Sequence, residues 1–232
     1  MENYMDKVIA MIDLTQDKPL NEIIYEGLRK AIITGVIPMG ERINEKNYAK
    51  ALNVSRTPIR ESLRRIQDED IVRYVPNLGI VITNFTHEDV DEIYKIRLSL
   101  DILACVNAAS LMNDEKEEEM RYLLEETYKA QKEGRVSDVI EMSKRFNSMI
   151  YDFAEMPRLK TIQNRLRDYL IRFRDISLTS DLRRQLALDD HQKIFDYMRS
   201  NNIDQMIELV TKHLYDSKKF IVLELEKQIN AR

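Results

Sequence analysis

The chain has 232 residues, with 36 Lys and Arg against 40 Asp and Glu, and a formal net charge of −4 at pH 7. This balance excludes a uniformly basic nucleic-acid coat, so any surface that binds anions must be local. One cysteine, Cys105, excludes an intramolecular disulfide and suits a reducing cytosol. No signal peptide pattern opens the chain and no apolar run approaches the ~20 residues that span a bilayer. We therefore expect a cytoplasmic protein with no membrane partner.

Three short helices are predicted in the first third of the chain, over residues 21–35 and 44–52 and from Ser55 onward. In each of them, apolar residues recur three or four positions apart, which places them on one helix face. Asn44 and Ser55 stand where a side chain caps the first free backbone amides of the second and third helices. Only five Gly and five Pro occur in the whole chain, which favours a mainly helical protein.

After Asp70 the pattern changes from helix to strand. Residues 71–83, "IVRYVPNLGIVIT", hold two runs of β-branched and aromatic residues around "PNLG". This arrangement predicts a hairpin with a Gly-containing turn. From Thr86 onward only amphipathic helical patterns follow, so we expect the domain boundary near residues 84–86.

Three arginines of the third helix, Arg56, Arg60 and Arg64, are spaced by four residues and lie opposite its apolar stripe. A short helix and a tight turn precede them, which is the helix-turn-helix arrangement. The second helix of that motif enters the DNA major groove with its N-terminal residues at the base edges. Arginine pairs bidentately with guanine or phosphate, while Ser55 and Thr57 at the helix start suit phosphate.

The hairpin that follows would act as a wing, and its tip can approach the DNA backbone because Gly79 has no side chain. The alternative interpretation is a solvated helix face on which the arginines pair with Glu61, Asp68 and Glu69. The capped helix before the arginines and the hairpin after them favour DNA binding over this alternative.

The stretch from residue 20 to 82, which contains "SRTPIRESLRRI", resembles the winged helix-turn-helix domain of GntR-type bacterial transcription regulators. This resemblance implies DNA contacts from the third helix, from the second helix and from the wing. The residues concerned are Lys46, Ser55, Arg56, Thr57, Arg60, Asn77 and Gly79. We accordingly assign residues 1–84 to a winged helix-turn-helix domain, with a core over 20–84 and a variable extension over 1–19.

Residues 86–232 are assigned to an all-helical domain that binds an effector and dimerises. The segments "IYKIRLSLDILACVNAAS", "RFNSMIYDFAEMPRL" and "DDHQKIFDYMRSNN" resemble the FCD effector domain of the FadR-like branch of the GntR family. The resemblance implies a helical bundle that encloses a small-molecule pocket. The fold class expected for the whole chain is thus mainly α, with a winged helix-turn-helix domain before a helical bundle.

Polar residues on apolar helix faces are the candidate effector ligands. His191 lies one turn before Ile194, and His213 lies one turn after Val210. Each histidine alone is more often a satisfied core residue, but two inward imidazoles favour a site. Arg97 lies in an apolar stripe and needs a partner, which is either Asp101 one turn on or a carboxylate ligand. Arg172 and Arg174 are further basic residues that either reach the pocket or lie on the solvated face of their helix, and the solvated face is favoured for at least one of them.

The FCD resemblance also implies a metal site, in which an Asp and a His one turn apart join two later histidines. His191 and His213 match the later pair, whereas Ser143 and Asn147 stand at the first two positions. This set leaves the charge of a divalent metal uncompensated, so we assign no cofactor and expect weak or absent binding of zinc or nickel. An anionic effector would complete the metal shell, or would bind Arg97, Asn147 and the histidines without metal.

These features predict a bacterial transcription regulator that binds palindromic operator DNA as a homodimer and senses a small, carboxylate-bearing metabolite. Two alternatives remain open at this point. One is an enzyme on a helical scaffold that uses His191 and His213, although no nucleophile with an adjacent base is visible. The other is an architectural DNA-binding protein that has no effector.

Overall fold

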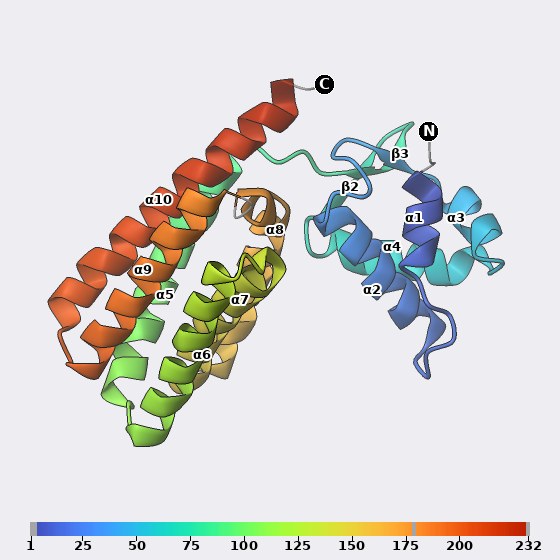
Figure 1. Ribbon diagram of the computed structural model, residues 1–232. Coiled ribbons are helices and arrows are strands. Elements are labelled where there is room, and N and C mark those ends of the chain that lie inside the picture. Colours follow the sequence, from blue (N-terminus) through green and yellow to red (C-terminus); the bar gives the residue numbers. More distant parts are fainter. Residues whose placement is uncertain (1–3, 178–179, 231–232) are drawn as a thin grey trace. The chain divides into compact units, whose positions relative to one another are not determined.

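The computed structural model describes residues 4–177 and 180–230, with side chains described at all of these positions except 171–177 and 228–230. The chain divides into two compact units, residues 1–85 and 86–232, and each is described by itself (Figure 1). The first unit combines short helices with a small sheet and the second is helical, so the expected mainly α class is confirmed.

The first unit is a winged helix-turn-helix. Its described elements are α1 Tyr4–Ala10, α2 Leu20–Ile33, β1 Arg42–Ile43, α3 Glu45–Ala51, α4 Arg56–Gln67, β2 Val72–Val75 and β3 Gly79–Ile82. The three strands form an antiparallel sheet in the order β1-β3-β2. The hairpin was predicted, whereas β1 was not, because two residues are too few to show a strand pattern.

The α4 helix is fixed by its buried face. Ile59, Leu63 and Ile66 are all buried in the core of the unit, mainly against α2. Ser62 lies on the same face and donates a hydrogen bond of 2.8 Å to the carbonyl oxygen of Asn21 on α2. Because this face is used entirely for packing, the opposite face of α4 is left exposed to solvent.

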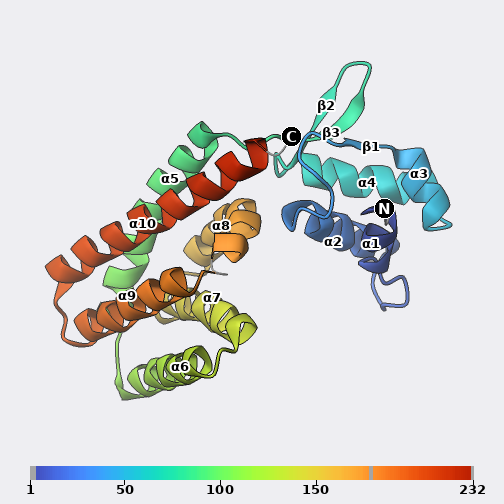
Figure 2. The same cartoon turned by 45° about the horizontal axis from the view of Figure 1, so that its top comes forward.

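Left-handed residues shape the turns that were predicted from the sequence. Asn53 has a φ of 54° and separates α3 from α4, which makes the helix-turn-helix turn tight. In the wing, Asn77 has a φ of 66° and Gly79 a φ of 86°. Figure 2 shows the resulting β2–β3 hairpin extending beyond the helices of its own unit.

The N-terminal extension contributes to the core of the first unit. Val8 of α1 and the following Ile12 are buried, and α1 packs against α2. A Cβ atom at Gly27 would lie 2.4 Å from Cγ1 of Ile12. Glycine at this position therefore permits the close approach of the extension to α2.

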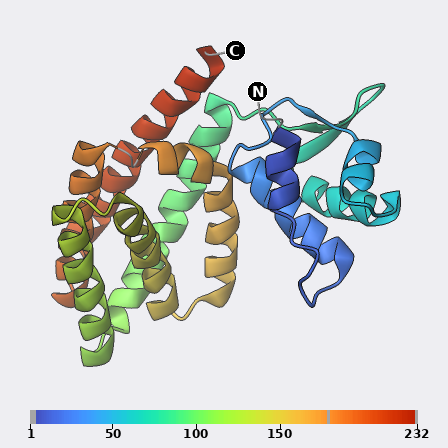
Figure 3. The ribbon, with the colours of Figure 1, turned by 45° about the vertical axis from the view of Figure 1, so that its right-hand side comes forward.

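The second unit is a helical bundle. Its described helices are α5 His87–Ser110, α6 Asp114–Lys132, α7 Val136–Phe153, α8 Pro157–Ser177, α9 Asp181–Arg199 and α10 Ile203–Asn230. α5 and α10 run side by side, α6 packs against α7 and α9, and α8 packs against α5, α7 and α10 (Figures 1 and 3). α5 begins at a capping box formed by Thr86 and Asp89.

The interior of this bundle is not purely apolar. Charged and polar side chains are buried on five of its helices, and they include Arg97, Asp101, Ser143, Gln163, Arg183, Arg184, Asp190 and His191. Buried charges are unfavourable unless they are paired or bind a ligand. This polar interior is therefore the feature of the bundle that a packing role alone does not explain.

Candidate DNA-binding surface and effector site

The residues predicted to contact DNA lie on the exposed surface of the first unit. Ser55, Arg56, Thr57 and Arg60 are exposed at the N-terminal half of α4, and Lys46 is exposed on α3. In the wing, the side chain of Asn77 is exposed and Gly79 is partly exposed. The helix, the preceding helix and the wing thus present all seven positions to solvent.

One acidic residue that the sequence did not reveal connects the two arginines of α4. Glu45, the first residue of α3, accepts a hydrogen bond of 3.0 Å from Nη2 of Arg56 through its Oε2 atom. The same oxygen accepts bonds of 3.3 Å from Nη2 and 3.4 Å from Nε of Arg60. The carboxylate therefore holds the two guanidinium groups side by side.

The alternative partners named from the sequence were wrong. Glu61 accepts from Asn21 at 3.3 Å, and Glu69 accepts from Arg29 at 2.7 Å, both across the α2–α4 interface. Asp68 stands at the C-cap of α4, away from the arginines at its start. The sequence spacing within α4 could not reveal Glu45, because the contact crosses from a neighbouring helix.

The start of α4 suits an anion. Ser55 occupies the predicted N-cap position with extended backbone angles, yet its side chain makes no capping hydrogen bond within the described chain. The first turn of α4 contains no acidic residue. A helix N-terminus with amide donors and no local negative charge is a favourable place for a phosphate group.

The second candidate site is a small cavity in the centre of the bundle. Asn147, His191 and His213 line it together with Asp101 and apolar residues of α7, α9 and α10. The cavity has a volume of about 20 Å³, which is enough for a single water molecule. Three of the four predicted effector residues thus come together around a space no larger than one water molecule.

The fourth predicted residue, Arg97, reaches this cavity only through its partner. Nη2 of Arg97 lies 3.5 Å from Oδ2 of Asp101, the partner expected one turn on. Tyr151 and Gln163 donate hydrogen bonds of 2.5 Å and 2.6 Å to the other oxygen of Asp101. Nε of Arg97 is buried without a hydrogen-bond partner among the described residues.

The two histidines lie beside each other and have different partners. Nδ1 of His213 is 3.0 Å from Oδ2 of Asp190. The ring of His191 stacks on Phe146 with a centroid distance of 4.1 Å, and it lies 5.1 Å from the ring of His213. Burial lowers the pKa of His213, although the hydrogen bond to Asp190 opposes this effect. Burial thus favours the neutral form of His213.

Comparison with known proteins gives a family match for each of the two units. The family model described as bacterial regulatory proteins, gntR family, matches residues 20–82, and the FCD domain model matches residues 92–216. The HTH-type transcriptional regulator YdhC of Bacillus subtilis is 34% identical over 210 residues, which cover 88% of this chain and 92% of that protein. The chain belongs to the GntR family.

Other proteins are similar to this chain over most of its length. The gluconate operon transcriptional repressor of Bacillus licheniformis is 26% identical over 88% of this chain and 86% of its own length. The structure of Escherichia coli McbR/YncC has a TM-score of 0.67 and 19% identity, covering 99% of this chain and 100% of that one. A GntR regulator from Rhodococcus sp. RHA1 has a TM-score of 0.66 at 22% identity and covers 87% and 97% of the two chains.

This GntR-family protein is accordingly a DNA-binding transcriptional regulator with an FCD domain. The matched families and relatives are transcriptional regulators and not enzymes, so the enzyme alternative based on the two histidines is not supported. In the described part of the chain, no helix combines the length and apolar character that crossing a membrane requires.

Among its described residues, the FCD domain does not present three protein ligands suited to a divalent metal. His191 and His213 offer two nitrogens, and Asp190 orients His213 as outer carboxylates do at metal centres. Asn147, however, donates its amide to the carbonyl oxygen of Ser143 at 2.8 Å. Among the described residues, no group of three His, Cys, Asp or Glu side chains could hold a metal ion.

Arg183 is a buried residue of the FCD domain that the sequence interpretation missed. Its side chain lies over the ring of Phe220, and its Nε atom has no partner within the described chain. Burial lowers the pKa of its guanidinium group. Arg183 lies two helical turns before His191 on α9, so the same inward face could have revealed it. The side chains of Arg172 and Arg174 lie outside the described residues.

Proposed function

We propose that the protein is a ligand-responsive regulator that binds palindromic operator DNA as a homodimer. Its FCD domain senses a small, carboxylate-bearing metabolite near Arg97, Asn147, His191 and His213. Such a regulator works in the compartment that holds the chromosome, which is the cytoplasm of a bacterium.

The excess of positive charge inside the bundle carries this proposal. Arg97 and Arg183 are both buried, and each has a guanidinium Nε atom without a partner in the described chain. The two acids of the interior already have partners. Asp101 accepts a hydrogen bond from Tyr151, and Asp190 is hydrogen-bonded to His213. A carboxylate ligand would supply the missing acceptor in a bidentate geometry that arginine favours.

The surface of α4 supports sequence-specific DNA binding. Arg56 and Arg60 have side-chain exposures of 57% and 65%, so both can reach DNA without unfolding any packed contact. One recognition helix offers few base contacts, and a two-fold dimer doubles them over two half-sites. Ile96 and Leu103 lie two turns apart on α5 and are 40% and 47% exposed, which supports self-association of the FCD domain.

Ligand and DNA would be coupled through the helix that begins the FCD domain. α5 carries Arg97 and Asp101, and residues 83–86 join it directly to β3 of the wing. A ligand that binds Arg97 would favour one position of α5 over another. DNA affinity would then change by the ratio of the ligand's affinities for the two arrangements.

The test is a ligand screen on the intact protein, with DNA from the promoter of its own gene as the operator probe. A set of small carboxylates is screened by thermal unfolding, and each hit is added to the protein–DNA complex. We expect at least one carboxylate to stabilise the protein and change its DNA affinity, and Arg97→Met to abolish both effects. DNA binding that no carboxylate changes would favour the architectural alternative without an effector.

A further inference from the structure

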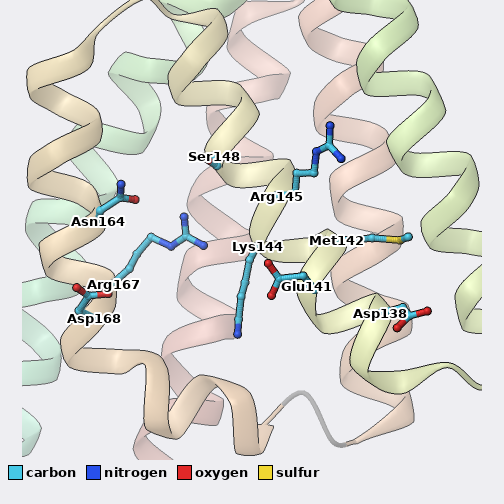
Figure 4. A pocket seen from close by; sticks show the side chains of 9 residues that line it. All are labelled: Asp138, Glu141, Met142, Lys144, Arg145, Ser148, Asn164, Arg167 and Asp168. Atoms are coloured by element: carbon cyan, nitrogen blue, oxygen red, sulfur yellow. The ribbon is translucent and has the colours of Figure 1, made fainter. Parts of the chain in front are cut away.

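A second, much larger space lies on the outside of the same bundle. The groove between α7 and α8 has a volume of about 690 Å³, which is within the range of small-molecule pockets (Figure 4). Arg167 and Asn164 project into it from α8, and Lys144 and Glu141 project from α7 (Figure 4). The central cavity, by comparison, has room for about one water molecule.

Arg167 is the cation of this groove that forms no direct ion pair with a described residue. It is partly buried, and no described carboxylate or acceptor lies within ion-pair or hydrogen-bond distance of its guanidinium group. Burial lowers the pKa of Arg167, and the positive charge of Arg97 adds to that effect, although Tyr151, Asp101 and the neighbouring Asp168 oppose it. A partly desolvated cation that is not directly paired is unfavourable, so an anion bound in the groove would stabilise Arg167.

We propose that the α7–α8 groove is a further ligand site, separate from the central cavity, which receives the carboxylate of a second small molecule with Arg167 as its main contact. This inference goes beyond the proposed function, which places the sensed carboxylate at Arg97 inside the bundle. Asn164, one turn before Arg167, would donate a hydrogen bond from its amide to the same carboxylate.

The rest of the groove restricts the class of ligand. Glu141 on α7 is exposed, and no described group forms an ion pair or a hydrogen bond with it. An acid at this position disfavours a ligand that carries a second negative charge there. The Glu141 carboxylate favours a hydrogen-bond donor on the ligand instead. The ligand class that fits is therefore a small carboxylate with hydroxyl or amino groups at its other end.

The groove is linked to the interior pair that the proposed function uses. Gln163 lies one turn before Arg167 on α8, and its amide donates to Asp101 at 2.6 Å and to the carbonyl oxygen of Arg97 at 3.4 Å. An anion bound at Arg167 would screen the repulsion between the guanidinium groups of Arg167 and Arg97. The packing of α8 on α5 would then tighten, which connects the groove to the helix that follows the wing.

The first experiment needs no ligand. Arg167→Met keeps the length of the side chain and removes the positive charge, and Arg165→Met on the exposed side of α8 is the matched control. We expect Arg167→Met to raise the thermal midpoint of the ligand-free protein by about 2–4 °C and Arg165→Met to leave it unchanged. A fall in the midpoint of Arg167→Met would indicate a structural arginine and overturn the proposal.

The second experiment uses acetate, lactate, serine and glycerate as probes, each against sodium chloride at equal ionic strength. We expect lactate, serine or glycerate to raise the midpoint of the wild type and of Arg165→Met, but not that of Arg167→Met. If none stabilises the wild type, the groove is not a site for this ligand class. If a probe stabilises Arg167→Met fully while Arg97→Met loses the response, the groove is wrong and the proposed function stands.

Discussion

Replacing Arg60 by alanine separates its role in folding from its role in DNA binding. In the free protein, Glu45 is the one described residue with which Arg60 forms hydrogen bonds. Nε and Nη2 of Arg60 lie 3.4 Å and 3.3 Å from Oε2 of Glu45. Its side chain is 65% exposed, and an exposed ion pair of this kind contributes about 0–1 kcal/mol to stability. Arg60→Ala should therefore leave the thermal midpoint within about 4 °C of the wild type.

The expected effect on DNA binding is much larger. A bidentate arginine–guanine pair contributes about 1–3 kcal/mol, and a symmetric dimer loses two of them, which gives about 2–6 kcal/mol. This loss corresponds to a roughly 30-fold or greater rise in Kd for the operator. Fluorescence anisotropy at fixed salt would measure it against operator and scrambled DNA, with Arg158→Ala, at an exposed position of α8 outside the DNA-binding unit, as the matched control.

The ratio of the two affinities decides the outcome. Loss of a base contact lowers operator binding and leaves scrambled DNA nearly unchanged, whereas loss of a phosphate contact lowers both equally. Equal losses, or an operator Kd within threefold of the wild type, would refute a base-reading role for Arg60. A fall in the thermal midpoint beyond about 5 °C would show that the ion pair with Glu45 is structural.

The first unit could be predicted well from the sequence because local signals determine it. Asn44 accepts hydrogen bonds from the amides of Lys46 and Asn47, as its capping position implied, and Asn53 adopts the expected left-handed conformation. The apolar stripe of α4 also left only one face for its arginines. The strand β1 could not be predicted because it is too short for a pattern. The role of Glu45 could not be predicted because its contact crosses between helices.

The polar interior of the FCD domain was predicted only in part. His191, His213 and Arg97 were identifiable because each interrupts an apolar helix face. Their partners come from other helices, as with Tyr151 on Asp101, and spacing along one helix carries no information about such pairs. The α7–α8 groove depends entirely on how two helices pack, so no pattern in the sequence reveals it.

Four further predictions test other parts of the molecule. Glu45→Gln should lower the ratio of operator affinity to scrambled-DNA affinity by about tenfold, because Arg56 and Arg60 lose the carboxylate that aligns them. A rise in DNA affinity would instead show that Glu45 competes with DNA phosphate for these arginines. Leu103→Glu should shift the protein from dimer to monomer in sedimentation. Ser143→Asp combined with Asn147→His should raise zinc affinity by calorimetry, since it supplies a charge and a third imidazole. The last prediction concerns acid stability. Burial lowers the pKa of His213 from its ordinary value of 6.5, so below that pH the unfolded chain binds more protons than the folded one. The contribution of His213 to stability is therefore complete above pH 6.5 and is lost as the pH falls toward its folded pKa. We expect the thermal midpoint to drop between pH 7 and pH 5.5, a window above the carboxylate range, and His213→Gln to flatten that drop. An equal drop in both proteins would mean that His213 is not held neutral by burial.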